Sequence, residues 1–189
     1  MNGYLTGRQG KKLLHLARQA LLHRLGRSEP VEKPEDGELH RELAAFVTLK
    51  KKGKLRGCIG HLEAVCPLWE GVRDNAVNAG FHDLRFSPLE ESELEHIHID
   101  ISVLSQPQPL SYEDGEDLVR KLRPGIDGVI LSDGRRRATF LPQVWQQLSA
   151  PQDFLSHLCL KAGLAGSAWR DYHLEILTYQ VQCFEEEGE

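Results

Sequence analysis

Residues 96–103 read His96-Ile97-His98-Ile99-Asp100-Ile101-Ser102-Val103, a strict alternation of polar and apolar side chains. Successive side chains of a β-strand point to opposite faces of its sheet, so this pattern predicts a strand with one buried face. The isoleucines and Val103 would form the buried face, and the histidines with Asp100 would form the solvated one.

Outward from this strand, further segments have the β-branched and aromatic composition of strands: residues 44–50, 54–59, 128–132, 136–140 and, near the C-terminus, 174–184. The first two flank a Lys51-Lys52-Gly53 turn and the next two flank Asp133-Gly134-Arg135. Glycine supplies the positive φ that tight hairpin turns require, so both pairs are predicted to be antiparallel hairpins.

Helices are expected between these strands. Thr6 and Gln9 form a capping-box pattern that opens a first helix, and Gly26 is typical of its end. Three prolines are suited to the first turn of further helices: Pro67, Pro142 and Pro151. Residues 116–122 are predicted to form one more short helix. Hairpins interspersed with helices predict an α+β fold with mainly antiparallel sheet. Residues 27–38 are charged and contain proline, as in a surface linker, and residues 185–189 form an acidic tail.

Composition excludes several classes of protein. The 189 residues are 40% hydrophobic, enough for a buried core. No apolar run approaches the roughly 18 residues of a membrane span, and residues 1–5 lack the apolar segment of a secretion signal. Four cysteines without a CxxC pair do not make a disulfide framework or a zinc ribbon. We therefore expect a cytoplasmic protein, with Cys66, Cys159 and Cys183 in its core.

The net charge of −5 is unevenly distributed. Residues 1–28 hold six bases and no acid, which leaves 17 bases and 28 acids, a charge of −11, in the remainder. A basic helix can dock on an acidic body or bind nucleic acid through residues 7–27. The first interpretation is favoured because the body supplies the complementary charge and the sequence pI is only about 6.0.

The segment Leu55-Arg56-Gly57-Cys58-Ile59-Gly60-His61 carries the strongest chemical signal. Glycine in a strand marks a bulge or a close approach of another group. Arg56 could favour the thiolate form of Cys58, and His61 could serve as a base. The structural alternative is a small buried thiol in a glycine-rich bulge.

The polar face of the strand predicted at residues 96–103 could also form a metal site. His96, His98 and Asp100 share one face, and two histidines with a carboxylate form a known iron-binding set. That face is predicted to be the wet one, so we expect no metal there; a zinc site at Cys58, His61 and Cys66 lacks a fourth ligand.

Ordered motifs along the chain resemble those of the AMMECR-domain family, whose bacterial and archaeal members are called AmmeMemoRadiSam system protein A. The matching segments are residues 46–49, 55–60, 78–86, 102–104, 125–129, 141–144, 159–164 and Trp169. The resemblance spans residues 5–185, which we take as a single AMMECR-type domain. It implies strand–helix–strand units arranged in two lobes, with the boundary between the lobes left open.

The resemblance also implies the site residues. Carried over position by position, they are Arg56, Gly57, Cys58, Gly60, Asp83, Arg85, Pro142, Gln143 and Lys161. His61 departs from the Thr or Ser of many relatives. Arg56, Arg85 and Lys161 could bind a carboxylate or phosphate around Cys58, with Asp83 orienting an arginine and Gln143 adding hydrogen bonds. The structural alternative is an Asp83–Arg85 salt bridge, with the glycines serving only packing.

Two functional hypotheses follow. The first is an enzyme or enzyme subunit acting on a small anionic metabolite, with Cys58 as the reactive thiol, His61 as a proton carrier, and no cofactor identified. The resemblance implies association with a Memo-like protein and a radical-SAM protein. The second is a non-catalytic adaptor that docks a partner through the glycine-rich surface. Nucleic-acid binding is a third and weaker hypothesis, and membrane association is not expected.

Overall fold

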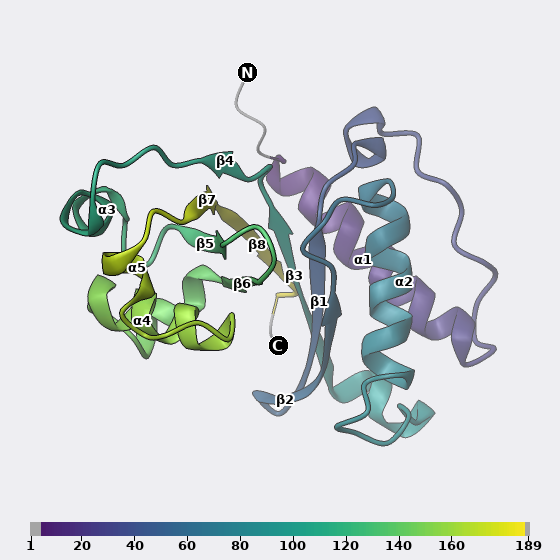
Figure 1. The fold of residues 1–189 in the computed structure, drawn as a ribbon. Coiled ribbons are helices and arrows are strands. Elements are labelled where there is room, and N and C mark those ends of the chain that lie inside the picture. The colour runs from purple at the N-terminus through teal and green to yellow at the C-terminus, as the bar shows by residue number, and fades with distance from the viewer. Residues whose placement is uncertain (1–4, 188–189) are drawn as a thin grey trace. The chain divides into compact units, whose positions relative to one another are not determined.

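Two four-stranded sheets organise the chain in the computed structural model, which describes residues 5–187 (Figure 1). One sheet belongs to a unit of residues up to Ser105 and from Gln182 onward, and the other to a unit of residues Gln106–Val181. We refer to these as the signature unit and the second unit. The α+β class with antiparallel sheets, predicted from the hairpins, is confirmed.

The sheet of the signature unit has the order β2-β1-β3-β8. Its strands are β1 (Ala45–Lys51), β2 (Lys54–Gly60), β3 (Ile97–Leu104) and β8 (Val181–Glu185). β1 pairs antiparallel with both β2 and β3. Ile97, Ile99, Ile101 and Val103 are buried, which confirms the predicted inner face of β3. His96 is not in this strand, because it ends the 3₁₀ helix η2 (Glu91–His96).

Two helices, α1 (Gly7–Arg24) and α2 (Leu68–Phe81), cover the inner face of this sheet side by side (Figure 1). The predicted capping box at the start of α1 is present, with Thr6 and Gln9 satisfying each other's backbone N–H groups. Gly26 has a φ of +72°, the left-handed conformation that ends helices. The apolar stripe of α1 and the inner faces of β1 and β3 form one buried core.

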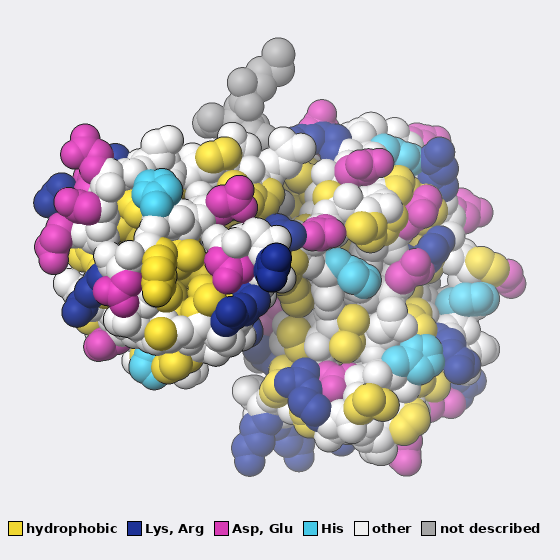
Figure 2. All heavy atoms as spheres, in the orientation of Figure 1, with side chains coloured by type: hydrophobic (Ala, Val, Ile, Leu, Met, Phe, Trp, Pro, Cys, Tyr) yellow, Lys and Arg dark blue, Asp and Glu magenta, His cyan; other side chains and the backbone are white. Residues whose placement is uncertain are grey.

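The basic face of α1 is paired with acidic groups of its own unit. Arg18 donates to Glu186 and to the carbonyl oxygens of Leu94 (2.9 Å) and Ile97 (2.7 Å). Lys12 pairs with Asp36 at 2.9 Å. The docking interpretation of the +6 segment therefore has a structural basis, and Figure 2 shows basic and acidic side chains mixed across the visible face.

Replacing Arg18 by alanine should destabilise the protein by about 2 kcal/mol, because Glu186 and two partly buried carbonyls lose their donor together. Urea denaturation followed by circular dichroism measures the loss. Lys11→Ala is the control: the Lys11–Glu187 pair is largely exposed, so its removal should have no measurable effect. Equal behaviour of the two variants would contradict the anchoring role of Arg18.

Residues 27–38, predicted as a surface linker, are half-buried or exposed throughout and lead into the 3₁₀ helix η1 (Gly37–His40). Asp36 fastens this segment to α1, since it accepts from Gln9 Nε2 at 3.2 Å as well as from Lys12. No helix among residues 5–187 is long and apolar enough to cross a membrane.

The second unit has the sheet order β4-β7-β5-β6. Its strands are β4 (Gln108–Pro109), β5 (Gly128–Ser132), β6 (Arg137–Phe140) and β7 (Glu175–Tyr179). Its helices are α3 (Gly115–Lys121), the 3₁₀ helix η3 (Pro142–Gln146), α4 (Pro151–Lys161) and α5 (Ala168–Asp171). Trp145 stacks on Phe154 with ring centroids 3.7 Å apart, at the centre of a separate core.

The single strand predicted over 174–184 is wrong, because β7 and β8 belong to different sheets. Tyr179 is buried, and its hydroxyl group lies 3.0 Å from the hydroxyl of Thr139 and donates to the carbonyl of Phe140, which holds β7 in the second unit.

The core position predicted for Cys183 is also wrong: it lies on β8 and is exposed, whereas Cys159 is buried as predicted and Cys66 is half-buried.

Candidate functional site

The glycine-containing strand β2 has the predicted bulge. Leu49 pairs with Gly57 but Lys50 pairs with Leu55, so Arg56 has no partner on β1. Gly57 faces α2 so closely that a Cβ atom would lie 2.0 Å from the carbonyl oxygen of Ala79. A Cβ on Gly60 would lie 2.5 Å from the carbonyl oxygen of Ala45. Both glycines are therefore required by close packing.

Cys58 is held in place by Asp83 and Arg85, a group we call the Cys58 clamp. The backbone N–H of Cys58 donates to Asp83 Oδ2 at 2.9 Å. The Arg85 guanidinium binds both oxygens of Asp83, at 2.9 and 2.7 Å, and reaches the carbonyl of Cys58 at 3.3 Å. The Asp83 side chain is 4% exposed and that of Arg85 is 55% exposed. The clamp thus joins the end of α2 to β2 and still presents a guanidinium to solvent.

The thiol group has a hydrogen-bond donor that the sequence did not reveal. Thr48 on β1 lies directly opposite Cys58, and its hydroxyl donates to Cys58 Sγ at 3.3 Å. Cys58 is half-buried, so the sulfur atom is positioned without being sealed in the core.

Arg56, predicted to bind an anion beside Cys58, is bound to Glu93 instead. Its guanidinium makes a bidentate pair with the Glu93 carboxylate at 3.0 and 2.8 Å, and the side chain is 11% exposed. Lys51 adds a third bond to Glu93 at 2.9 Å. Phe86 lies close to both arginines, with its ring centroid 5.9 Å from Arg56 Cζ and 5.5 Å from Arg85 Cζ.

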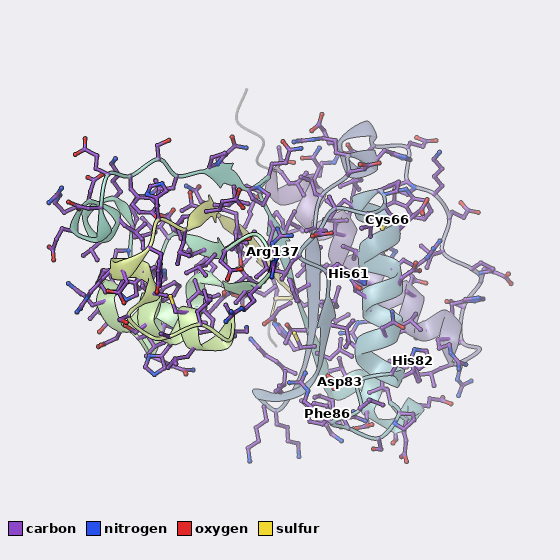
Figure 3. All side chains as sticks on the ribbon, viewed as in Figure 1. His61, Cys66, His82, Asp83, Phe86 and Arg137 are labelled. Atoms are coloured by element: carbon purple, nitrogen blue, oxygen red, sulfur yellow. The ribbon has the colours of Figure 1, made fainter. Side chains whose placement is uncertain are left out.

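The remaining predicted residues do not join the clamp. His61 is exposed, and Figure 3 shows it well separated from Asp83 and Phe86 along the sheet. Gln143 and Lys161 belong to the second unit, where Lys161 donates to the carbonyl of Thr139 at 3.0 Å. Pro142 is buried there at the start of η3. Their substrate-binding roles, and the role of His61 as a proton carrier, stay predictions.

The carboxylates of the site are strongly stabilised in their ionised form. The hydrogen bonds from Arg85, reinforced by the N–H of Cys58, hold the pKa of Asp83 well below its usual range. Arg56, followed by Lys51, lowers the pKa of Glu93 to about 2. Both pairs therefore remain charged at neutral pH, and the partly exposed Arg85 guanidinium lies 3.3 Å from the carbonyl oxygen of Cys58.

Together these features define an α+β protein in which a free thiol on a glycine-containing strand is held by a buried aspartate and a half-exposed arginine. The AMMECR1 family model matches residues 14–184. The chain belongs to the AMMECR1 family, as its motifs predict.

Relatives extend over almost the whole chain. A protein from Thermofilum pendens is 37% identical over 97% of this chain and 92% of its own length. One from Methanopyrus kandleri is 39% identical over 99% of this chain and 93% of its own length. The crystal structure of uncharacterized protein PH0010 from Pyrococcus horikoshii is similar with a TM-score of 0.82 and 31% identity, covering 97% of this chain and 94% of that chain.

Proposed function

We propose that this protein is a cytoplasmic enzyme or enzyme subunit that acts on a small anionic metabolite through Cys58. One observation carries the proposal: the half-buried Cys58 is fixed at its backbone by the clamp and at its sulfur by Thr48. A thiol that served only to fill space would need neither a donor to Sγ nor a cation beside its carbonyl group. The reducing cytoplasm would keep the thiol free.

The chemistry that fits this arrangement is covalent transfer of an acyl group. The Cys58 thiolate attacks an activated acyl carbon, the S–C bond forms, and the bond to the leaving group breaks with its electron pair. The proton of the thiol passes to water or to the leaving group. The exposed part of the Arg85 guanidinium would bind the negative charge of the metabolite, because guanidinium groups match carboxylate and phosphate geometry.

The substrate site proposed here is smaller than the residue set carried over from the family. Arg85 and the backbone around Cys58 are its core, because the Arg85 side chain is half-exposed, whereas that of Arg56 is largely buried against Glu93. The family resemblance supports a Memo-like protein and a radical-SAM protein as partners in the same process.

Alkylation tests the reactivity of Cys58 against an internal control. Cys183 is exposed and Cys58 is only half-buried, so exposure alone predicts that Cys183 reacts faster. We expect the reverse: at pH 7, iodoacetamide should label Cys58 at least about tenfold faster, because its sulfur atom is held in place by Thr48, beside the Arg85 guanidinium, as a nucleophile would be. Mass spectrometry of the native protein follows each cysteine separately. Labelling of Cys58 at or below the rate of Cys183 would overturn the proposal.

A non-catalytic adaptor is the second candidate, and one observation favours it. Leu84, between the two clamp residues, is fully exposed, and Leu55 on β2 is 46% exposed. Two exposed leucines beside the site offer an apolar anchor to a partner protein. Replacing Cys58 by Ser separates the candidates, since an adaptor retains its cellular function and an enzyme of the proposed kind loses it.

A further inference from the structure

Three metal-ligating side chains meet on the outer face of the signature unit's sheet, opposite α1 and α2. They are His98 and Asp100 on β3 and Glu185 at the end of β8, and their ligand atoms lie within 4.8 Å of one another. We propose that these three residues bind one divalent transition-metal ion. The site goes beyond the proposed function and does not depend on Cys58.

The sheet topology creates this cluster. His98 and Asp100 are two residues apart, so they share the outer face of β3 while Ile97, Ile99 and Ile101 are buried on the inner face. β8 lies next to β3 in the sheet and brings Glu185 to the same place from near the C-terminus. His96, the third ligand considered from sequence, is excluded from the strand and is replaced by a carboxylate.

Asp100 has an oxygen available for an ion. Its Oδ1 is buried and has no hydrogen-bond partner among residues 5–187, while the other oxygen, Oδ2, pairs with Lys50. His98 Nε2 lies 3.6 Å from Oδ1, too far for a hydrogen bond but close to the separation of two ligands on one ion. A bound cation would give the buried oxygen the partner it lacks.

The donor set indicates the class of metal. Two ligands that each bind one ion at about 2.0–2.2 Å lie at most about 4.4 Å apart. The three ligand atoms lie within 4.8 Å of one another, so a small movement of the side chains toward each other would complete the site. One imidazole and two carboxylates suit Zn²⁺ or Mn²⁺, and the remaining coordination positions would be left to water or a substrate. Cys183, also on β8, is the nearby thiol that a softer metal could use.

Lys50 is a cation already paired with one of these ligands. It lies opposite His98 in the β1–β3 register and pairs with Asp100. Its pKa is raised, first by Asp100 and then by Glu185 and Cys183. An ammonium group so close to an ion repels it, so Lys50 must swing away when metal binds. This makes Lys50 a competitor whose removal should strengthen metal binding.

Equilibrium dialysis of the full chain against Zn²⁺, and separately against Mn²⁺, tests the site. We expect one ion per chain for each metal. His98→Ala and Glu185→Gln should each weaken binding by at least about tenfold, and Lys50→Gln should tighten it by about tenfold. His157→Ala, which removes an exposed histidine of the second unit, should leave binding unchanged.

Two outcomes would overturn the proposal. One is failure of both the native protein and Lys50→Gln to bind either metal at a stoichiometry of one. The other is binding of Zn²⁺ alone that survives His98→Ala and disappears in Cys183→Ser, which would assign the metal to the thiol. Cys58→Ser should retain binding, so loss of the thiol chemistry and loss of the metal site can be distinguished.

Discussion

Gly57→Ala is expected to destabilise the protein by about 3 kcal/mol, a decrease in Tm of roughly 6–12 °C. The added methyl group would lie 2.0 Å from the carbonyl oxygen of Ala79 and 2.9 Å from its carbon. These are backbone atoms of α2, so the clash cannot be relieved by rotating a side chain. Either α2 moves off the sheet or β2 bends, and both open the core beneath them. Urea denaturation followed by circular dichroism measures the loss.

Gly7→Ala is the matched control for this substitution. Gly7 is the first residue of α1, and a Cβ there would meet no atom of the described residues, 5–187, within 4 Å. Alanine should therefore be neutral or stabilise the helix by up to about 1 kcal/mol. If Gly57→Ala were as stable as Gly7→Ala, close packing would not explain the glycine, and a role in ligand binding would become the better explanation.

The hairpins, helices and fold class could be predicted from the sequence because they depend on local signals. Each signal specifies one local structure: the alternation at 97–103 specifies a strand, and the capping box at Thr6 and Gln9 specifies a helix start. Gly53, with its φ of +73°, specifies a turn. The division of residues 174–184 between two sheets could not be predicted. Both halves have the composition of strands, and their partners, β5 and β3, are distant in sequence.

The site was predicted less well for a related reason. A regular two-residue turn that pairs Lys51 with Lys54 would place Thr48 opposite Gly57, whereas the bulge at Arg56 moves the register by one and places Thr48 opposite Cys58. The same bulge separates Arg56 from the β1 ladder, and Glu93 binds it. The Asp83–Arg85 pair was recognisable because its members are two residues apart. Thr48 and Glu93 were missed because nothing local marks them as neighbours of residues 55–61, and Glu185 because nothing local places it beside His98 and Asp100.

Asp83→Asn should destabilise the protein by about 2–3 kcal/mol at pH 7, because the asparagine amide cannot accept both Arg85 bonds and the Cys58 N–H. The loss should depend on pH. Since Arg85 lowers the pKa of Asp83 in the folded state, the unfolded chain takes up the proton first as the pH falls. The stabilisation by Asp83 is complete above about pH 5 and declines as the pH falls through about 4.

Between pH 3 and 7, the free energy of unfolding obtained from urea denaturation should therefore depend less on pH for Asp83→Asn than for the native protein. The stability difference between the two should be largest at neutral pH. Some acid sensitivity should persist in the variant, because Glu93, whose pKa is lowered to about 2, still loses its stabilising charge at low pH. A stability difference that stayed constant over this range would contradict the pH-dependent stabilisation assigned to the ionised Asp83.

Glu93→Gln separates the effect of the clamp on Cys58 from its effect on stability. Glu93 also makes a bidentate pair with an arginine and is similarly shielded, at 13% exposure, but its carboxylate, as described, makes no hydrogen bond to Cys58. Both substitutions should lower stability, whereas only Asp83→Asn should change the alkylation rate of Cys58. That rate should fall several-fold, because the substitution removes the acceptor that fixes the Cys58 N–H and holds the Arg85 guanidinium beside it. Equal rates in the two variants would mean that the Asp83–Arg85 pair only joins α2 to the sheet, and the adaptor would then be the better description of this surface.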